Sequence, residues 1–291
     1  MERPPESDEP QPPVELSPKD LAREVIFARL LAQPVRLTWW MVGVLVVLWL
    51  GLWGLGAAHL AAFFKGQATQ VNGLDLATYT GMKATPQILH KGQWWRLISS
   101  MFIHLDVTHL AFNAYGLYQI GPLIERFFGK SRWVIVYVLS GVVGSLASLY
   151  WSDVPSAGAS GAIYGVVGAL LVFGYKYRAI LPERVSHAFT RGLAPWVVFG
   201  IGIGIVGVLP MDNAAHLGGL ATGALLALVM PSRLHAAPTG ARRHAVRALA
   251  VMLSVGTCVA LALWAREIAT CAPTLATYAQ CYPELFTATR P

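Results

Sequence analysis

Seven long apolar runs divide this chain of 291 residues and set its fold class. Several approach the roughly 20 residues that a helix needs to cross the hydrocarbon core of a membrane, whereas the second and fourth runs are shorter. Only 13% of the residues are charged, against about 25% in a typical soluble domain. The sequence therefore predicts an all-α polytopic membrane protein with seven spans. The runs are 39–58, 106–122, 133–151, 160–175, 194–210, 214–231 and 246–265.

The basic residues predict how these spans are oriented. Arg and Lys cluster before the first span and in the even-numbered loops, and the loops at 152–158 and 211–213 contain none. Cytoplasmic loops of membrane proteins carry such an excess of basic residues. We therefore expect a cytoplasmic N-terminus, an external C-terminus and a place in the plasma membrane. The net charge of +7 follows from this distribution and does not indicate a nucleic-acid partner.

The composition divides the chain into three parts. Residues 1–36 form a cytoplasmic tail, in which the Pro- and Glu-rich start is predicted to be disordered and residues 19–36 an amphipathic helix on the membrane surface. Residues 37–231 hold six spans, with Trp94 and Trp95 in a long first loop that is typical of an interfacial segment. Residues 232–291 comprise a linker, the seventh span and an external tail. The first run is predicted to be a retained span, because no small-residue cleavage site follows it.

The three cysteines fall near the C-terminus. Cys258 lies inside the last span, where a buried free thiol is expected. Cys271 and Cys281 fall in the external tail, where a disulfide is chemically permitted and two free thiols are an equal alternative. A disulfide there is expected to restrain only the tail.

Four polar residues inside the spans indicate a functional pocket. Ser160 opens the fourth span, His216 opens the sixth, and His109 and Asn113 lie in the outer part of the second. Polar groups are expensive in lipid, so they mark functional sites or contacts between helices. The predicted orientation places all four at the external side, which indicates one pocket open to the outer leaflet.

Ser160 follows Pro155 and Gly158, two residues that interrupt a helix, so it is expected near a helix N-terminus. Free backbone N–H groups at that position favour a developing oxyanion. The alternative is that Ser160 only caps the helix, although Ser156 could cap equally well.

His216 shares a helix face with Gly219, and Gly161 opens a similar glycine face on the fourth span. Small residues let membrane helices approach closely, so the Ser160 hydroxyl and the His216 ring could come within hydrogen-bond distance. Catalysis and structural polar packing are both consistent with this spacing. His109 and Asn113, four residues apart on one face, could either stabilise an oxyanion or hold helices together.

Two other kinds of catalytic site are disfavoured by the sequence. The zinc-protease motif His-Glu-x-x-His is absent. Aspartyl chemistry needs two carboxylates at one depth, whereas Asp106, Asp153 and Asp212 stand at the edges of spans. Asp212 either caps the sixth span or approaches His216 as a third catalytic member, and the cap is favoured.

Residues 94–231 resemble the rhomboid family of intramembrane proteases. The resemblance rests on the order and spacing of many short matches, each of which is weak alone. They are Trp95-Arg96, His104, His109-x-x-x-Asn113, Glu125-Arg126, Gly158-Ala-Ser160-Gly161, Tyr164, Asn213, Ala215-His216 and Gly219.

The resemblance implies a six-helix rhomboid-like bundle, here followed by a seventh helix. It also implies a Ser160–His216 catalytic dyad, an oxyanion site that uses His109, Asn113 and the Ser160 backbone N–H, and packing of Tyr164 against His216. The implied substrates are transmembrane proteins in the lipid bilayer, and no cofactor or metal is implied. The sequence specifies no oligomeric state.

Two other functions remain open at this point. A non-catalytic adaptor of the same fold would bind client helices without needing the Ser160–His216 contact. A small transporter would need a polar pathway that continues to the cytoplasmic side, where these spans carry little polarity.

Overall fold

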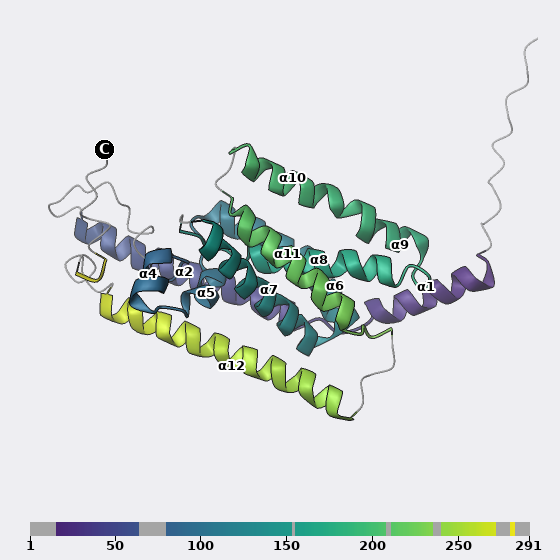
Figure 1. The fold of residues 1–291 in the computed structure, drawn as a ribbon. Helices are drawn as coiled ribbons and strands as arrows, with labels where there is room; N and C mark the ends of the chain where they lie inside the picture. Colours follow the sequence, from purple (N-terminus) through teal and green to yellow (C-terminus); the bar gives the residue numbers. More distant parts are fainter. Residues whose placement is uncertain are drawn as a thin grey trace, which may run out of the picture.

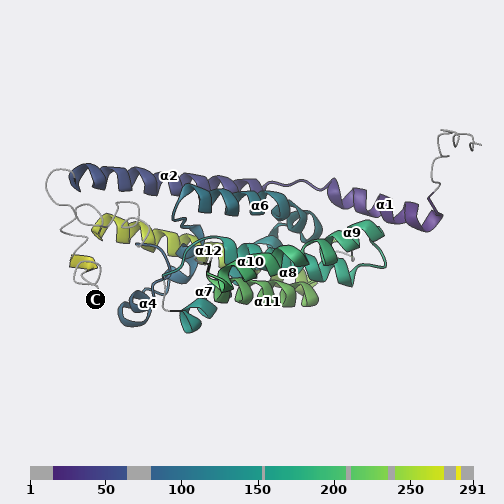
Figure 2. The same cartoon turned by 90° about the horizontal axis from the view of Figure 1, so that it is seen from above.

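The computed structural model describes residues 16–63, 80–152, 155–207, 211–234, 240–271 and 280–282. Within these ranges the chain folds into helices, and the only β-type pairing is one isolated bridge between Lys83 and Ser156. Figures 1 and 2 show the helices in two views at right angles. The predicted disorder of the N-terminal tail lies almost wholly outside the described residues.

The N-terminal part forms two helices in a row. Helix α1 (Pro18–Leu31) begins after Ser17, whose side chain accepts a hydrogen bond from the backbone N–H of Asp20. This helix covers most of the predicted amphipathic segment. Helix α2 (Leu37–Phe63) is the first apolar helix.

The long segment between α2 and α6 contains short helices rather than a free loop. These are α4 (Thr85–Lys91), α5 (Arg96–Ser99) and the 3-10 helix η1 (Ser100–Phe102). Helix α6 (Val107–Phe128) follows, with Asp106 accepting a hydrogen bond from the backbone N–H of His109. Helix α7 (Lys130–Trp151) begins after Gly129, whose φ of 86° turns the chain between the two.

Helix α6 extends further than its apolar run because the charge of Glu125 is satisfied inside the protein. The carboxylate of Glu125 accepts hydrogen bonds from the backbone N–H groups of Arg36, Leu37 and Thr38 at 2.9–3.0 Å. It also accepts one from the Thr38 hydroxyl. Buried charge is tolerated when its hydrogen bonds are complete, so these contacts hold the start of α2 against α6.

The second half of the chain contains α8 (Ser160–Lys176), α11 (Asn213–Val229) and α12 (Gly240–Cys271). Between α8 and α11, α9 (Glu183–His187), the π-helix η2 (Ala188–Gly192) and α10 (Ala194–Ile205) follow one another. Much of the loop predicted between the fourth and fifth spans is therefore helical. In the described part of the chain, four helical stretches are long and apolar enough to cross a membrane, namely 37–54, 130–151, 183–205 and 240–271, and α8 and α11 are shorter apolar helices.

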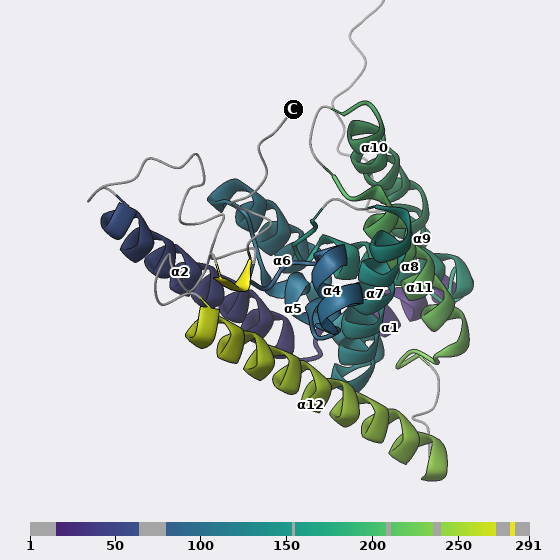
Figure 3. The same cartoon turned by 60° about the vertical axis from the view of Figure 1, so that its left-hand side comes forward.

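Helix α8 lies at the centre of the bundle, where it packs against α11, α7 and α6. Phe127 and Phe173 stack there with ring centroids 4.5 Å apart, and both are fully buried. Helices α2 and α12 run along one side of this centre, and α10 lies on the other side (Figure 3). The described residues thus form the predicted polytopic helical bundle, and the long helix α12 follows α11 on its C-terminal side.

Candidate active site

Ser160 is the first residue of α8. The chain before it is not helical, and Gly158 has a φ of 115°, a backbone conformation that residues other than glycine rarely adopt. Among the described residues, no side chain caps α8. The suggestion that Ser156 could cap this helix is therefore wrong: its backbone N–H and C=O pair instead with Lys83, at 2.9 and 2.8 Å.

His216 lies in the first turn of α11, and Asp212 caps this helix by accepting a hydrogen bond from the backbone N–H of Ala215 at 3.0 Å. The Ser148 hydroxyl donates to the other carboxylate oxygen of Asp212. The Nδ1 atom of His216 has no hydrogen-bond partner among the described residues. The geometry of Asp212 is therefore that of a cap.

The side chains of Ser160 and His216 meet between α8 and α11. The Nε2 atom of His216 lies 2.9 Å from the Oγ atom of Ser160, which is hydrogen-bond distance. His216 is buried and Ser160 is half-buried. The two helices approach through glycines, because a Cβ atom at Gly219 would overlap the carbonyl oxygen of Gly161.

Tyr164 fixes the plane of the imidazole. Its ring stacks on that of His216 with centroids 4.3 Å apart and an interplanar angle of 5°. Tyr164 is one turn after Ser160 on α8, so a single helix supplies both the hydroxyl and the stacking surface. The ring of His216 is thereby held between α8 and its own helix.

His109 and Asn113 reach the segment before Ser160 from α6. A Cβ atom at Gly158 would lie 2.6 Å from Nε2 of His109 and 3.5 Å from Nδ2 of Asn113. The Nδ2 atom of Asn113 donates to the His109 carbonyl oxygen at 3.0 Å. The glycine at 158 therefore leaves room for two polar side chains beside the start of α8.

His104, on the loop before α6, supports His109. The two rings meet edge to face with centroids 5.2 Å apart. Burial, assisted by the neighbouring His109, lowers the pKa of His104 to about 3. His104 is therefore neutral at physiological pH and adds no positive charge to the site.

A small cavity of about 10 Å³ adjoins Ser160. This volume accommodates about one water-sized group. Its lining is almost entirely small residues, including Ser100, Gly141, Ser145, Gly158 and Gly161.

The segment before Ser160 is held by backbone contacts that the sequence analysis missed. Besides the Lys83–Ser156 pairing, the backbone N–H of Gly158 donates to the carbonyl oxygen of Ser100 at 2.9 Å. The Lys83 ammonium, itself buried, donates to the Ser152 carbonyl oxygen at 2.7 Å. Nothing in the sequence around Lys83 predicts this pairing, because backbone atoms make most of the contacts.

Comparison with known proteins places this site in a family. The sequence profile described as the rhomboid domain matches residues 91–233. Rhomboid protease GluP of Bacillus subtilis is 36% identical over 146 residues, which cover 50% of this chain and 28% of GluP. The putative rhomboid protease YdcA of Bacillus subtilis is 32% identical over 140 residues, which cover 47% of this chain and 68% of YdcA. This chain belongs to the rhomboid family.

Other rhomboid relatives show how much of the chain the similarity covers. Rhomboid protease AarA of Providencia stuartii is 31% identical over 176 residues, which cover 52% of this chain and 62% of AarA. The matches thus span from about a quarter to about two thirds of the length of these three relatives. The matched rhomboid domain contains Ser160 and His216, and α1, α2 and α12 lie outside it.

The rhomboid site is built from groups on three helices and one loop segment. Among the described residues, no group of three or more His, Cys, Asp or Glu side chains is arranged to hold a metal ion. What the site offers chemically is a hydroxyl beside an imidazole, with backbone and side-chain N–H donors nearby.

Proposed function

We propose that this rhomboid is an intramembrane serine protease that hydrolyses peptide bonds in or near the transmembrane segments of other membrane proteins. The observation that carries the proposal is the 2.9 Å separation of Ser160 Oγ and His216 Nε2. A serine is a weak nucleophile until a neighbouring base takes its proton. A non-catalytic adaptor would not need this contact.

The proposed reaction is acyl transfer to Ser160. His216 Nε2 takes the hydroxyl proton as Oγ attacks the peptide carbonyl carbon, and it then gives that proton to the leaving amine as the C–N bond breaks. A water molecule next gives a proton to His216 and attacks the ester, which releases the acid and restores the Ser160 hydroxyl. Stacking on Tyr164 keeps the imidazole in the plane that both steps require.

The negative charge of the tetrahedral intermediate is proposed to be held by three N–H donors. The backbone N–H of Ser160 belongs to the first turn of α8 and therefore has no partner within that helix. Nε2 of His109 and Nδ2 of Asn113 both lie close to Gly158, two residues before Ser160. Such fixed donors act where charge develops.

The small cavity beside Ser160 supports a preference for small side chains near the cleaved bond. Its volume of about 10 Å³ and its lining of glycine and serine would exclude a large residue. The substrate helix must also unwind locally, because helical carbonyl groups are engaged in backbone hydrogen bonds. A transmembrane segment with small residues next to a helix-breaking residue is the substrate class that fits.

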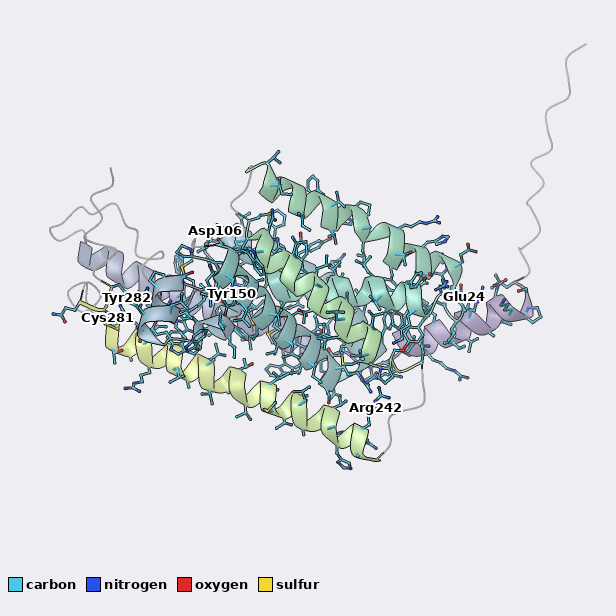
Figure 4. The ribbon with its side chains drawn as sticks, viewed as in Figure 1. Glu24, Asp106, Tyr150, Arg242, Cys281 and Tyr282 are labelled. Carbon is cyan, nitrogen blue, oxygen red and sulfur yellow. A yellow bond between two sulfur atoms is a disulfide. The ribbon has the colours of Figure 1, made fainter. Side chains whose placement is uncertain are left out.

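We also propose that α1 lies at the cytoplasmic face and the end of α12 at the external face. Arg126 and Arg233 both donate to Gln33, just after α1. Arg184 on α9 pairs with Glu24 on α1 at 2.6 Å. The Arg242 end of α12 lies far from Cys281 and Tyr282 (Figure 4). This orientation puts Ser160 in the outer half of a plasma membrane. Residues 37–231, which contain Ser160 and His216, are the proposed protease core.

Cleavage of a model transmembrane substrate by the purified, reconstituted protein tests the proposal. We expect Ser160→Ala and His216→Ala each to abolish cleavage, and the double variant to lose little more than either, since the two residues act as a unit. Ser254→Ala, on α12 with its hydroxyl bonded to the Ala250 carbonyl, is the matched control and should cleave normally. Normal cleavage by Ser160→Ala would reject the protease and favour the adaptor.

A further inference from the structure

The C-terminal segment 280–282 packs against the chain between α2 and α6. Cys281 is joined by a disulfide to Cys271, at the end of α12. Tyr282, the next residue, is completely buried. Figure 4 shows Cys281 and Tyr282 at the end of the molecule where α12 finishes. The expectation that a disulfide here restrains only the tail is therefore wrong, because the described part of the tail is part of the packed structure.

Tyr282 bridges a buried positive charge and a carboxylate. Its hydroxyl donates to Glu267 at 2.6 Å and accepts a hydrogen bond from Nη2 of Arg96 at 3.2 Å. Arg96 is completely buried. A buried charge needs such compensation, so removing the bridge would disturb the position of the guanidinium.

Lys91 holds the same segment from α4. Its ammonium donates to the carbonyl oxygen of Cys281 at 2.7 Å and lies 5.4 Å from the centre of the Tyr282 ring. The tail therefore contacts both α4 and α5, the two short helices that precede the α6 side of the candidate site.

Arg96 connects Tyr282 to the chain that pairs with the segment before Ser160. Its Nη1 atom donates to the carbonyl oxygen of Met82 at 2.8 Å. The next residue, Lys83, is the one whose backbone pairs with Ser156. Ser156 lies in the short non-helical segment that leads through Gly158 to Ser160, so a continuous set of contacts joins Tyr282 to the start of α8.

We propose that Tyr282, held by the Cys271–Cys281 disulfide, is a positioning residue that fixes the segment before Ser160 through Arg96 and the Lys83–Ser156 pairing. The inference rests on the proposed protease function. The disulfide keeps Tyr282 in place, and its reduction by a dithiol converts the two sulfurs to thiols while the dithiol is oxidised to its own disulfide. The oxidised protein is the more active form.

The test compares Tyr282→Ala, Tyr282→Phe and wild type in the reconstituted cleavage assay. We expect Tyr282→Ala to lower kcat roughly 10- to 100-fold with little change in KM, because a displaced catalytic group costs turnover rather than binding. Tyr282→Phe keeps the ring and should lose less. Tyr150→Ala, at an exposed tyrosine on α7, is the matched control and should match wild type.

Hydrogen exchange supplies a readout at the contacts themselves. The backbone N–H groups of Lys83 and Ser156 should exchange faster in Tyr282→Ala, because their pairing is loosened. Exchange in the middle of α8 should be unchanged, which also shows that the variant is folded. Unchanged kcat and unchanged exchange at Lys83 and Ser156 in the folded variant would overturn the inference.

Reduction tests the same inference on the unaltered chain. Dithiothreitol should lower kcat of wild type once mass spectrometry shows Cys271 and Cys281 reduced, and it should not change a Cys271→Ser, Cys281→Ser double variant. Cys258 is a free thiol as expected, but it is exposed rather than buried, and Cys258→Ser should respond as wild type does. Full activity of the reduced wild type would overturn the inference about Tyr282 and would leave the proposed protease function unaffected. Absence of cleavage by the oxidised wild type would instead contradict the proposed protease.

Discussion

Gly219 packs directly against the carbonyl group of Gly161, with no room for a side chain between them. One turn further along, Gly223 meets Gly165 in the same way. In a membrane, small residues at such positions let two helix backbones approach. This contact between α11 and α8 brings His216 within 2.9 Å of Ser160, so the hydrogen bond depends on glycines that take no part in it.

A methyl group at this contact should therefore disable the site. Gly219→Ala is expected to lower the free energy of unfolding by about 1–3 kcal/mol, the usual cost of overpacking, and to reduce cleavage strongly because Ser160 and His216 are pushed apart. Gly256→Ala is the matched control, since Gly256 lies in α12 with open space around it. That variant should be stabilised by about 0.5–1 kcal/mol, as alanine is the better helix former. Equal thermal midpoints for the two variants would contradict the packing argument.

Asp212 should act as a cap and not as a third catalytic residue. Asp212→Asn keeps an oxygen for the backbone N–H of Ala215, and asparagine caps about as well as aspartate. We expect turnover within about twofold of wild type on these grounds. A carboxylate that orients the imidazole would instead cost about 10⁴-fold, as in triad proteases, and a loss of that size in measured kcat would contradict the cap.

Asn113 should contribute to turnover more than to substrate binding. Asn113→Ala removes one proposed oxyanion donor, which typically lowers kcat by about 10²–10³-fold. Gln119→Ala removes an exposed side-chain amide from the same helix and should leave kcat unchanged. If Asn113→Ala changed KM alone, its side chain would belong to substrate binding and the oxyanion assignment would be wrong.

The sequence predicted the helices well, because each membrane helix must be apolar along its own length. The ends were predicted less well where charges are satisfied internally. Helix α6 continues through Glu125, whose carboxylate binds backbone N–H groups at the start of α2. Hydropathy alone treats such a carboxylate as exposed and ends the helix before it.

The candidate site was predicted in part, since glycine spacing and polar residues at one depth can be read from the sequence. The predicted Tyr164–His216 packing is observed, and so is the Cys271–Cys281 disulfide. The contacts that hold the segment before Ser160 in place were not predicted. The Lys83–Ser156 pairing uses backbone atoms, which carry no residue signature, and Arg96 and Tyr282 are 186 residues apart. Neither contact follows from a local pattern.

Covalent labelling of Ser160 by a fluorophosphonate is the most direct test of the proposed chemistry. Such a reagent reacts with a serine whose proton is taken by a neighbouring base. Mass spectrometry of the labelled, folded protein should find the adduct on Ser160 in wild type, no adduct in Ser160→Ala and greatly slowed labelling in His216→Ala. An unlabelled Ser160 in folded wild type, or labelling that does not depend on His216, would contradict the proposal that the two residues form a catalytic dyad.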